Sequence, residues 1–249
     1  MVAVFRKRPD RIRGIAGSLE GKSVLLIDSV TGAGPGIAQV VSQSGAAVTL
    51  ATADHVGLDL QLRALGNAAG GISGVAMPLA TAEEHRALLD RIETAFDTVV
   101  INPSPANLDV TTERRGSHLE PRNAVAIARA AVERMRNRGT EGSVVFITGI
   151  KSARSDASAH AFLEAEMERL ARDCAPNAIR VNAVAPGHVE ISRKGRGVAS
   201  RGAPLGRVSV HPIEVGKAVW FLINDDLSPG ITGTTLKTDR GASLLQPEW

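Results

Sequence analysis

The chain has no tyrosine among its 249 residues, so no phenolic hydroxyl is available to it for proton transfer. Its single cysteine, Cys174, excludes an internal disulfide and fits a reducing cytoplasm. Aromatic residues make up only 3%, so the stacking platforms of a nucleic-acid binder are scarce. No apolar run reaches the ~18 residues of a membrane span, and the charged N-terminus lacks the apolar stretch of a secretory signal. These absences favour a cytoplasmic protein with neither a membrane nor a nucleic acid as partner.

The chain is mildly basic, with a net charge of +3 and an isoelectric point near 9.4. Basic residues gather in two segments, from Arg6 to Arg13 and from Arg193 to Arg207. Such segments are most simply solvated, but arginine forks also suit the phosphates of coenzyme A. Contact with an acyl-CoA therefore stays open as their functional interpretation. The six histidines show no metal-ligand spacing, so no metal site is expected.

Short continuous apolar runs alternate with helical patterns along the chain, as in strands buried on both faces of a sheet. The runs predict seven strands, at Ser23–Ile27, Ala47–Ala51, Val75–Met77, Thr98–Ile101, Ser143–Ile147, Ile179–Ala185 and Gly233–Lys237. Helices are expected between them, at about Gly36–Ser44, Leu58–Leu65, after a capping box at Thr81–Glu84, at Asn123–Met135, at Ala157–Cys174 and from Pro212 onward. This alternation predicts an α/β fold, a single-domain doubly wound parallel sheet with helices on both faces. It should occupy residues 20–249, preceded by a loosely tied basic arm at residues 1–19.

Four segments of the chain carry a resemblance to a known family. They are Gly21–Lys22, Gly36–Ala38, Ile179–Gly187 and a series of C-terminal pieces between Gly206 and Gly241. Their order and spacing resemble those of the short-chain dehydrogenase/reductase family over roughly residues 20–241. The resemblance implies a Rossmann-like fold, hydride transfer with a nicotinamide cofactor, and assembly into tetramers or dimers. It also implies that the helices near 121–137 and 157–174 form a subunit interface.

The glycine-rich turn of the cofactor site that this resemblance implies is altered. Such a turn lets backbone amides approach a pyrophosphate at a helix N-terminus. The segment Thr31–Ala38 resembles it through Gly32, Gly34 and Gly36, but Pro35 removes one amide donor. These glycines could equally serve only to make the turn, so we expect a vestigial loop.

The other cofactor contacts are altered as well. Thr52 stands where the family has an acidic residue that accepts from the NAD ribose, and Asp54 follows two residues later. Asn102 is what remains of an Asn-Asn-Ala-Gly turn after the fourth strand. We therefore expect no cofactor on this chain and NAD on a partner subunit.

All four catalytic positions that the resemblance implies are changed. The asparagine falls near Glu120, the serine near Thr148 and Gly149, the tyrosine on Asp156 and the lysine on His160. An aspartate with a pKa of ~3.9 is already ionised at neutral pH, and as a base it is about six units weaker than tyrosine. Asp156 and His160 are four residues apart and could form a new acid–base pair on one helix face. The simpler interpretation makes Asp156 a helix-start residue and His160 a helix-face residue, with no catalytic residue left.

The changed site beside a retained scaffold predicts a non-catalytic subunit of a hetero-oligomeric, NAD-dependent short-chain alcohol dehydrogenase. Its partner would be an active paralogue, arranged as a heterotetramer, and its substrate would be a hydroxyacyl-CoA. Two alternatives stay open. One is a ligand-sensing regulatory protein that reuses the fold, and the other is an active reductase with non-standard acid–base residues.

Overall fold

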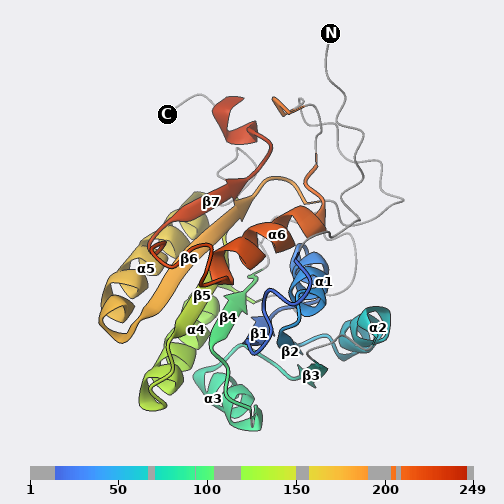
Figure 1. Ribbon diagram of the computed structural model, residues 1–249, viewed down its shortest axis with the longest axis vertical. Coiled ribbons are helices and arrows are strands. Elements are labelled where there is room, and N and C mark those ends of the chain that lie inside the picture. Colours follow the sequence, from blue (N-terminus) through green and yellow to red (C-terminus); the bar gives the residue numbers. More distant parts are fainter. Residues whose placement is uncertain are drawn as a thin grey trace.

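The computed structural model of the 249-residue chain describes residues 15–66, 71–92, 94–103, 119–149, 157–189, 203–205 and 209–245. The strands form one seven-stranded sheet in the order β3-β2-β1-β4-β5-β6-β7 (Figure 1). Their bounds are Ser23–Ile27 for β1, Ala47–Thr52 for β2, Ile72–Ala76 for β3, Thr98–Ile101 for β4, Gly142–Ile147 for β5, Ile179–Pro186 for β6 and Thr235–Thr238 for β7. All neighbouring pairs are parallel, which confirms the predicted doubly wound α/β fold.

Six α-helices connect the described strands. They are α1 (Gly34–Gln43), α2 (His55–Leu65), α3 (Ala82–Arg91), α4 (Pro121–Asn137), α5 (Ala157–Cys174) and α6 (Pro212–Ile223). The capping box predicted at α3 is present, because the Thr81 hydroxyl accepts from the Glu84 amide while the Glu84 carboxylate accepts from the Thr81 amide. None of the described helices is both long enough and apolar enough to cross a bilayer.

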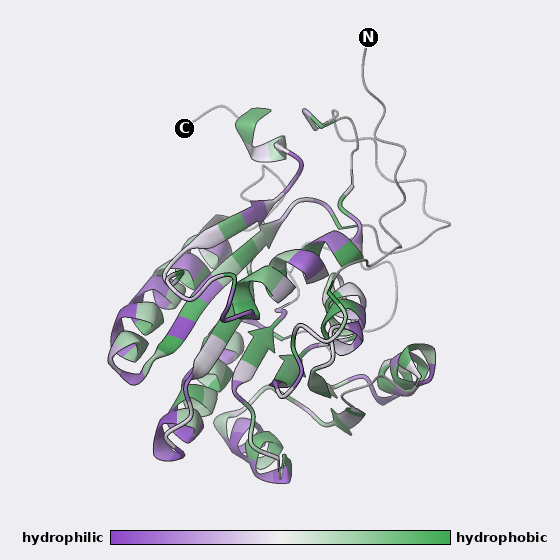
Figure 2. Cartoon of the chain, in the orientation of Figure 1, coloured by the Kyte–Doolittle hydropathy of each residue, from purple (hydrophilic) through white to green (hydrophobic). Residues whose placement is uncertain are grey.

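Two apolar cores lie on opposite faces of the sheet. Helices α1, α2 and α6 cover one face, and α3, α4 and α5 cover the other. Figure 2 shows that apolar residues are concentrated in the strands and that hydrophilic residues occupy the outer faces of the helices. Strand β3 at the sheet edge is only partly buried, which explains why its predicted bounds were the least accurate.

Helices α1 and α6 touch through their backbones. A Cβ atom added at Gly36 would lie 2.2 Å from the Pro212 carbonyl carbon, and one added at Gly216 would lie 2.6 Å from the Gly36 oxygen. Real side chains do not tolerate such distances, so both glycines are required for this close approach. Gly36 therefore serves helix packing at the start of α1.

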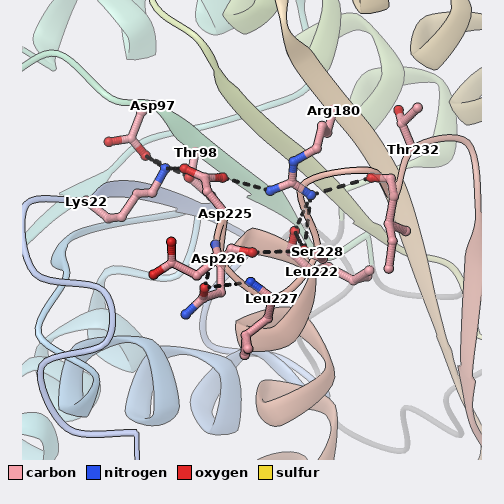
Figure 3. A network of polar contacts seen from close by, with 12 residues as sticks. Lys22, Asp97, Thr98, Arg180, Leu222, Asp225, Asp226, Leu227, Ser228 and Thr232 are labelled. Atoms are coloured by element: carbon pink, nitrogen blue, oxygen red, sulfur yellow. Dashed lines mark hydrogen bonds and ion pairs between the residues drawn. The ribbon is translucent and has the colours of Figure 1, made fainter.

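The amino edge of the sheet carries a network of paired charges (Figure 3). Asp225, which follows α6, accepts from Lys22 and from Arg180 Nη2 at 2.9 Å. Lys22 Nζ lies 3.9 Å from Asp97, whose other oxygen accepts from the Ser23 amide at 3.0 Å. The network thus ties the starts of β1, β4 and β6 to the end of α6.

The segment before β1 packs on the domain from residue 15 onward. Ile15 and Leu19 are buried, the Trp220 indole donates to the Ser18 hydroxyl at 2.8 Å, and Asn224 donates to the Ser18 carbonyl. Residues 15–19 are therefore fixed to α6, unlike the loosely tied arm that we expected. Residues 1–14, which include the first basic segment, lie outside the described part of the chain.

Candidate functional site

The strand order reverses between β1 and β4, so the carboxyl ends of these two strands form the switch point of the sheet. In open α/β sheets, ligands bind in the crevice outside such a point. In this chain the switch point is bordered by the loop 28–33 between β1 and α1, by the end of β2, and by Asn102 directly after β4.

The side chain of Asn102 fixes the loop 28–33 through hydrogen bonds. It is buried, and its side-chain nitrogen donates to the carbonyl oxygens of Asp28 and Thr31, each at 2.9 Å. Its backbone amide continues the pairing of β4 with β1 by donating to Ile27 at 3.1 Å. The asparagine that we assigned to a vestigial cofactor turn is therefore a structural anchor between β1 and β4.

The three glycines of the loop have different roles. Gly32 adopts a φ of 51° and no atom lies within 4 Å of a Cβ placed there, so it makes the turn. A Cβ at Gly34 would lie 2.2 Å from the Ser29 oxygen, and Gly36 is in contact with α6. Helix α1 begins at Gly34, two residues before the predicted start. Close contacts within the chain thus account for the presence of glycine at positions 34 and 36.

The first turn of α1 offers few donors to a phosphate. The amide of Gly34 donates to the Thr31 carbonyl at 2.8 Å, and Pro35 has no amide hydrogen. Two of the first three residues of the helix therefore have no backbone N–H that could donate to a ligand. The side-chain positions at its start carry no charge or hydroxyl group that could compensate.

Asp28 is the residue of this loop that sequence reasoning did not identify. It is 1% exposed, and neither carboxylate oxygen has a hydrogen-bond partner in the described structure. Burial raises the pKa of the Asp28 carboxyl to about 7, the nearby Thr31 hydroxyl and Leu119 amide lower it in part, and the charge of Asp54 raises it further. The Thr31 hydroxyl is itself buried without a partner of good geometry. The signal in the sequence is an acidic residue directly after a wholly apolar strand.

The acceptors at the end of β2 already have hydrogen-bond donors within the chain. Thr52 is fully buried, and its hydroxyl accepts from the Asp54 amide at 3.2 Å. The Asp54 carboxylate caps α2 by accepting from the Gly57 amide at 2.9 Å. Together with the orphaned carboxylate of Asp28 and the lost donors of α1, these contacts do not fit the requirements of a dinucleotide.

The structure places the described catalytic positions at the carboxyl end of β5 and on α4 and α5. Thr148 and Gly149 directly follow β5, His160 lies in the first turn of α5, and Glu120 is the exposed N-cap residue of α4. Asp156 lies outside the described residues. The second basic segment, from Arg193 to Arg207, also lies outside them except for residues 203–205. The proposed pairing of Asp156 with His160 therefore stays a prediction.

The imidazole of His160 fills the space beside Gly149. A Cβ atom at Gly149 would lie 2.8 Å from the His160 Cε1 atom, and Gly149 has a φ of 77°. His160 is 5% exposed, so its ring belongs to the packed interior at this point. The neighbouring Thr148 hydroxyl lies within 3.4 Å of the Gly149 oxygen and 3.5 Å of the Val184 oxygen. A serine-like side chain at position 149 would collide with the histidine.

The parallel sheet with helices on both faces, and its switch point between β1 and β4, define a Rossmann-like α/β protein. Over residues 29–243 the chain matches the family model described as Enoyl-(Acyl carrier protein) reductase. This match spans more than half of the 249 residues, so the chain belongs to the short-chain dehydrogenase/reductase family. Within the described residues no group of acidic, histidine or cysteine side chains could hold a metal ion.

Individual relatives agree with this assignment. The chain is 29% identical to cis-4-hydroxycyclohexanecarboxylate dehydrogenase of Sinomonas cyclohexanicum, with 87% of this chain and 96% of that protein covered. It is 31% identical to carbonyl reductase family member 4 of Danio rerio, with 63% and 74% covered. It also resembles the structure of a 3-oxoacyl-[acyl-carrier protein] reductase from Brucella melitensis with bound NAD, with a TM-score of 0.76, 20% identity, and 91% and 93% covered. At that identity the structural likeness supports the fold alone.

Proposed function

We propose that this chain is a non-catalytic subunit of a hetero-oligomeric, NAD-dependent short-chain alcohol dehydrogenase. An active paralogue with an intact Tyr-x-x-x-Lys motif would carry both the chemistry and the NAD. The observation that carries the proposal is the complete lack of tyrosine in a member of a family that uses this residue as its acid–base group.

Proton transfer is the step that this chain lacks. Hydride transfer to a carbonyl leaves an alkoxide, which needs a proton donor within hydrogen-bond reach. The tyrosine position holds Asp156, which is ionised at neutral pH if its pKa is ordinary. The other three positions hold the exposed Glu120, the loop residues Thr148 and Gly149, and a buried His160 packed against that loop. A positioned acid–base group contributes about 10²–10⁴ to the rate, so its loss reduces turnover severely.

The assembly part of the proposal concerns the outer surfaces of α4 and α5. The two helices are joined side by side, because Arg129 forms an ion pair with Glu166, and Arg136 donates to the Asp173 carbonyl. Their inner faces are buried in one core with β4 to β6. By resemblance to the family, the outer faces of this pair would meet the same helices of the catalytic paralogue across a two-fold axis.

The proposed substrate is a hydroxyacyl-CoA. The matching family model describes reductases of acyl groups held on acyl carrier protein, which are thioesters like acyl-CoA. The most specific version of this substrate proposal is the oxidation of 2-(hydroxy(phenyl)methyl)succinyl-CoA in anaerobic toluene degradation. It rests on similarity in length, and in the pattern of lost residues, to the inactive subunit of that two-subunit dehydrogenase.

The test is to purify the chain alone and after co-expression with a neighbouring short-chain dehydrogenase gene that encodes Tyr-x-x-x-Lys. We expect no NAD reduction by the isolated chain and an active complex of fixed stoichiometry after co-expression. Replacing the tyrosine of the paralogue with phenylalanine should abolish turnover, whereas His160→Gln in this chain should leave kcat within about twofold of the wild type.

Two outcomes would contradict the proposal. The first is NAD-dependent turnover by the isolated chain. The second is a large loss of kcat in the His160→Gln complex while assembly and thermal stability are unchanged, which would favour an active site in this chain. A stable homo-oligomer that never associates with the paralogue, and whose melting temperature rises with a small ligand, would instead support the regulatory alternative.

A further inference from the structure

Asp28 occupies a backbone conformation that usually belongs to glycine. Its φ is 56°, in the left-handed region, and it is the first residue after β1. Glycine adopts this conformation without steric cost, and aspartate is one of the few other residues that tolerate it. In a dinucleotide-binding turn the first glycine lies here, because the chain bends sharply between the strand and the helix. Asp28 therefore allows the same sharp bend as a glycine, and it places a carboxylate in the turn.

The described residues around Asp28 provide no positive charge to compensate this carboxylate. Neither β1, β4 nor α1 contains a charged residue, so no cation faces it from these elements. Asp54, after β2, is of the same sign and raises the pKa of Asp28. From the side of α4 it is approached by the Leu119 backbone. A buried acid that has no counter-ion among the described residues is costly, so its presence at the switch point of the sheet calls for a functional explanation.

The geometry points to Asp28 as the residue that excludes dinucleotides from this chain, by placing a carboxylate in the turn that a pyrophosphate has to approach. This inference rests on the proposed function and deepens it by naming the group that keeps the cofactor on the partner subunit. The pyrophosphate and the Asp28 carboxylate are both anions, and the first turn of α1 has few free amides that could offset the repulsion between them.

The repulsion should be large and pH-dependent. Two like charges held within several ångströms of each other in a partly buried site change an affinity by roughly 10- to 100-fold. Since burial raises the pKa of Asp28 to about 7, the carboxylate is mostly charged at pH 8 and mostly neutral at pH 6. The exclusion should therefore be strongest at pH 8.

The experiment is a fluorescence titration with NADH of the wild-type chain and of Asp28→Gly, Asp28→Asn and Asp59→Asn, at pH 8 and pH 6. Asp59→Asn makes the same charge change at an exposed position of α2 and serves as the control. We expect Asp28→Gly and Asp28→Asn to bind NADH at least about tenfold more tightly than the wild type at pH 8. The difference should shrink at pH 6, and the control should behave like the wild type.

Several results would overturn the inference. One is a wild-type chain that binds NADH as tightly as the Asp28 variants at pH 8. Another is a set of folded variants, shown by unchanged circular dichroism, that bind no better than the wild type. Tight binding by Asp28→Gly without any by Asp28→Asn would show that side-chain volume and not charge excludes the cofactor. The failure of the proposed function would appear separately, as turnover by the isolated chain.

Discussion

Charged side chains at the amino ends of the strands are paired, and the charged side chain at the carboxyl end of β1 is not paired with any described residue. At the amino edge, Lys22, Asp97, Arg180 and Asp225 are paired with one another across three strands and a helix end. At the carboxyl edge, Asp28 is buried without a partner in the described structure. The charges at the amino ends of the strands are paired, whereas the carboxylate without a described partner lies at the switch point of the sheet. We relate this difference to the proposed loss of the cofactor site.

The largest expected effect is the pH dependence that Asp28 imposes on stability. The folded-state pKa of Asp28 is about 7, above the ordinary 3.8. Between about pH 4 and pH 7 the folded state therefore keeps a proton on Asp28 that the unfolded state has already released. The free energy of unfolding should fall as pH rises from about 4 to about 7, by up to about 4 kcal/mol. Asp28→Asn should lack this fall. Urea denaturation from pH 4.5 to pH 8 measures it, and parallel curves for the two proteins would contradict the isolated carboxylate.

The second prediction asks whether the glycines of the loop serve packing. Gly36→Ala should lower the free energy of unfolding by about 2–3 kcal/mol, because its methyl group would collide with the Pro212 backbone. Gly230→Ala is the matched control, since no atom lies within 4 Å of a Cβ placed there. Thermal melts of both variants check the difference. Equal stability of the two variants would show that α1 and α6 are not in close contact.

The smallest effect is expected at the amino edge. Burial raises the pKa of Asp225, but the hydrogen bonds and charges of Lys22 and Arg180 outweigh this and leave the pKa below its ordinary value. Such a group stabilises the fold above its unfolded-state pKa, and this contribution is lost as pH falls through the folded pKa. Asp225 is about half exposed, so Asp225→Asn should cost only about 0.5–1 kcal/mol at pH 7.

Asp226→Asn provides the control for that measurement, because the Asp226 side chain forms no ion pair in the described structure. The difference between the two variants in urea should shrink in high salt and at acid pH. A difference that persists at pH 2.5 would mean that Asp225 acts through something other than its charge.

Much of the fold could be predicted because buried parallel strands leave a direct signal. The strands Ser23–Ile27 and Thr98–Ile101 were located to the residue, and the other buried strands β2, β5 and β6 to within one residue at each end. The edge strand β3 was misplaced because its exposed positions dilute that signal. The packing of residues 15–19 on α6 was missed because it depends on contacts of Ser18 with Trp220 and Asn224, more than 200 residues away.

The sequence identified which family residues are replaced at the candidate site, but not how the replacing residues are arranged. The absent tyrosine is visible in the sequence itself, whereas the contact of His160 with Gly149 depends on how α5 packs beside β5. Asp28 was passed over because a sequence does not reveal burial or backbone conformation at a single position. Both features follow from tertiary packing, which local patterns do not encode.

The number of NADH molecules bound at saturation by the co-purified complex tests the central claim most directly. Equilibrium dialysis at pH 8 should give one NADH for each catalytic subunit and none for this chain. One NADH on every chain of the complex would contradict the claim that this subunit has given up its cofactor site.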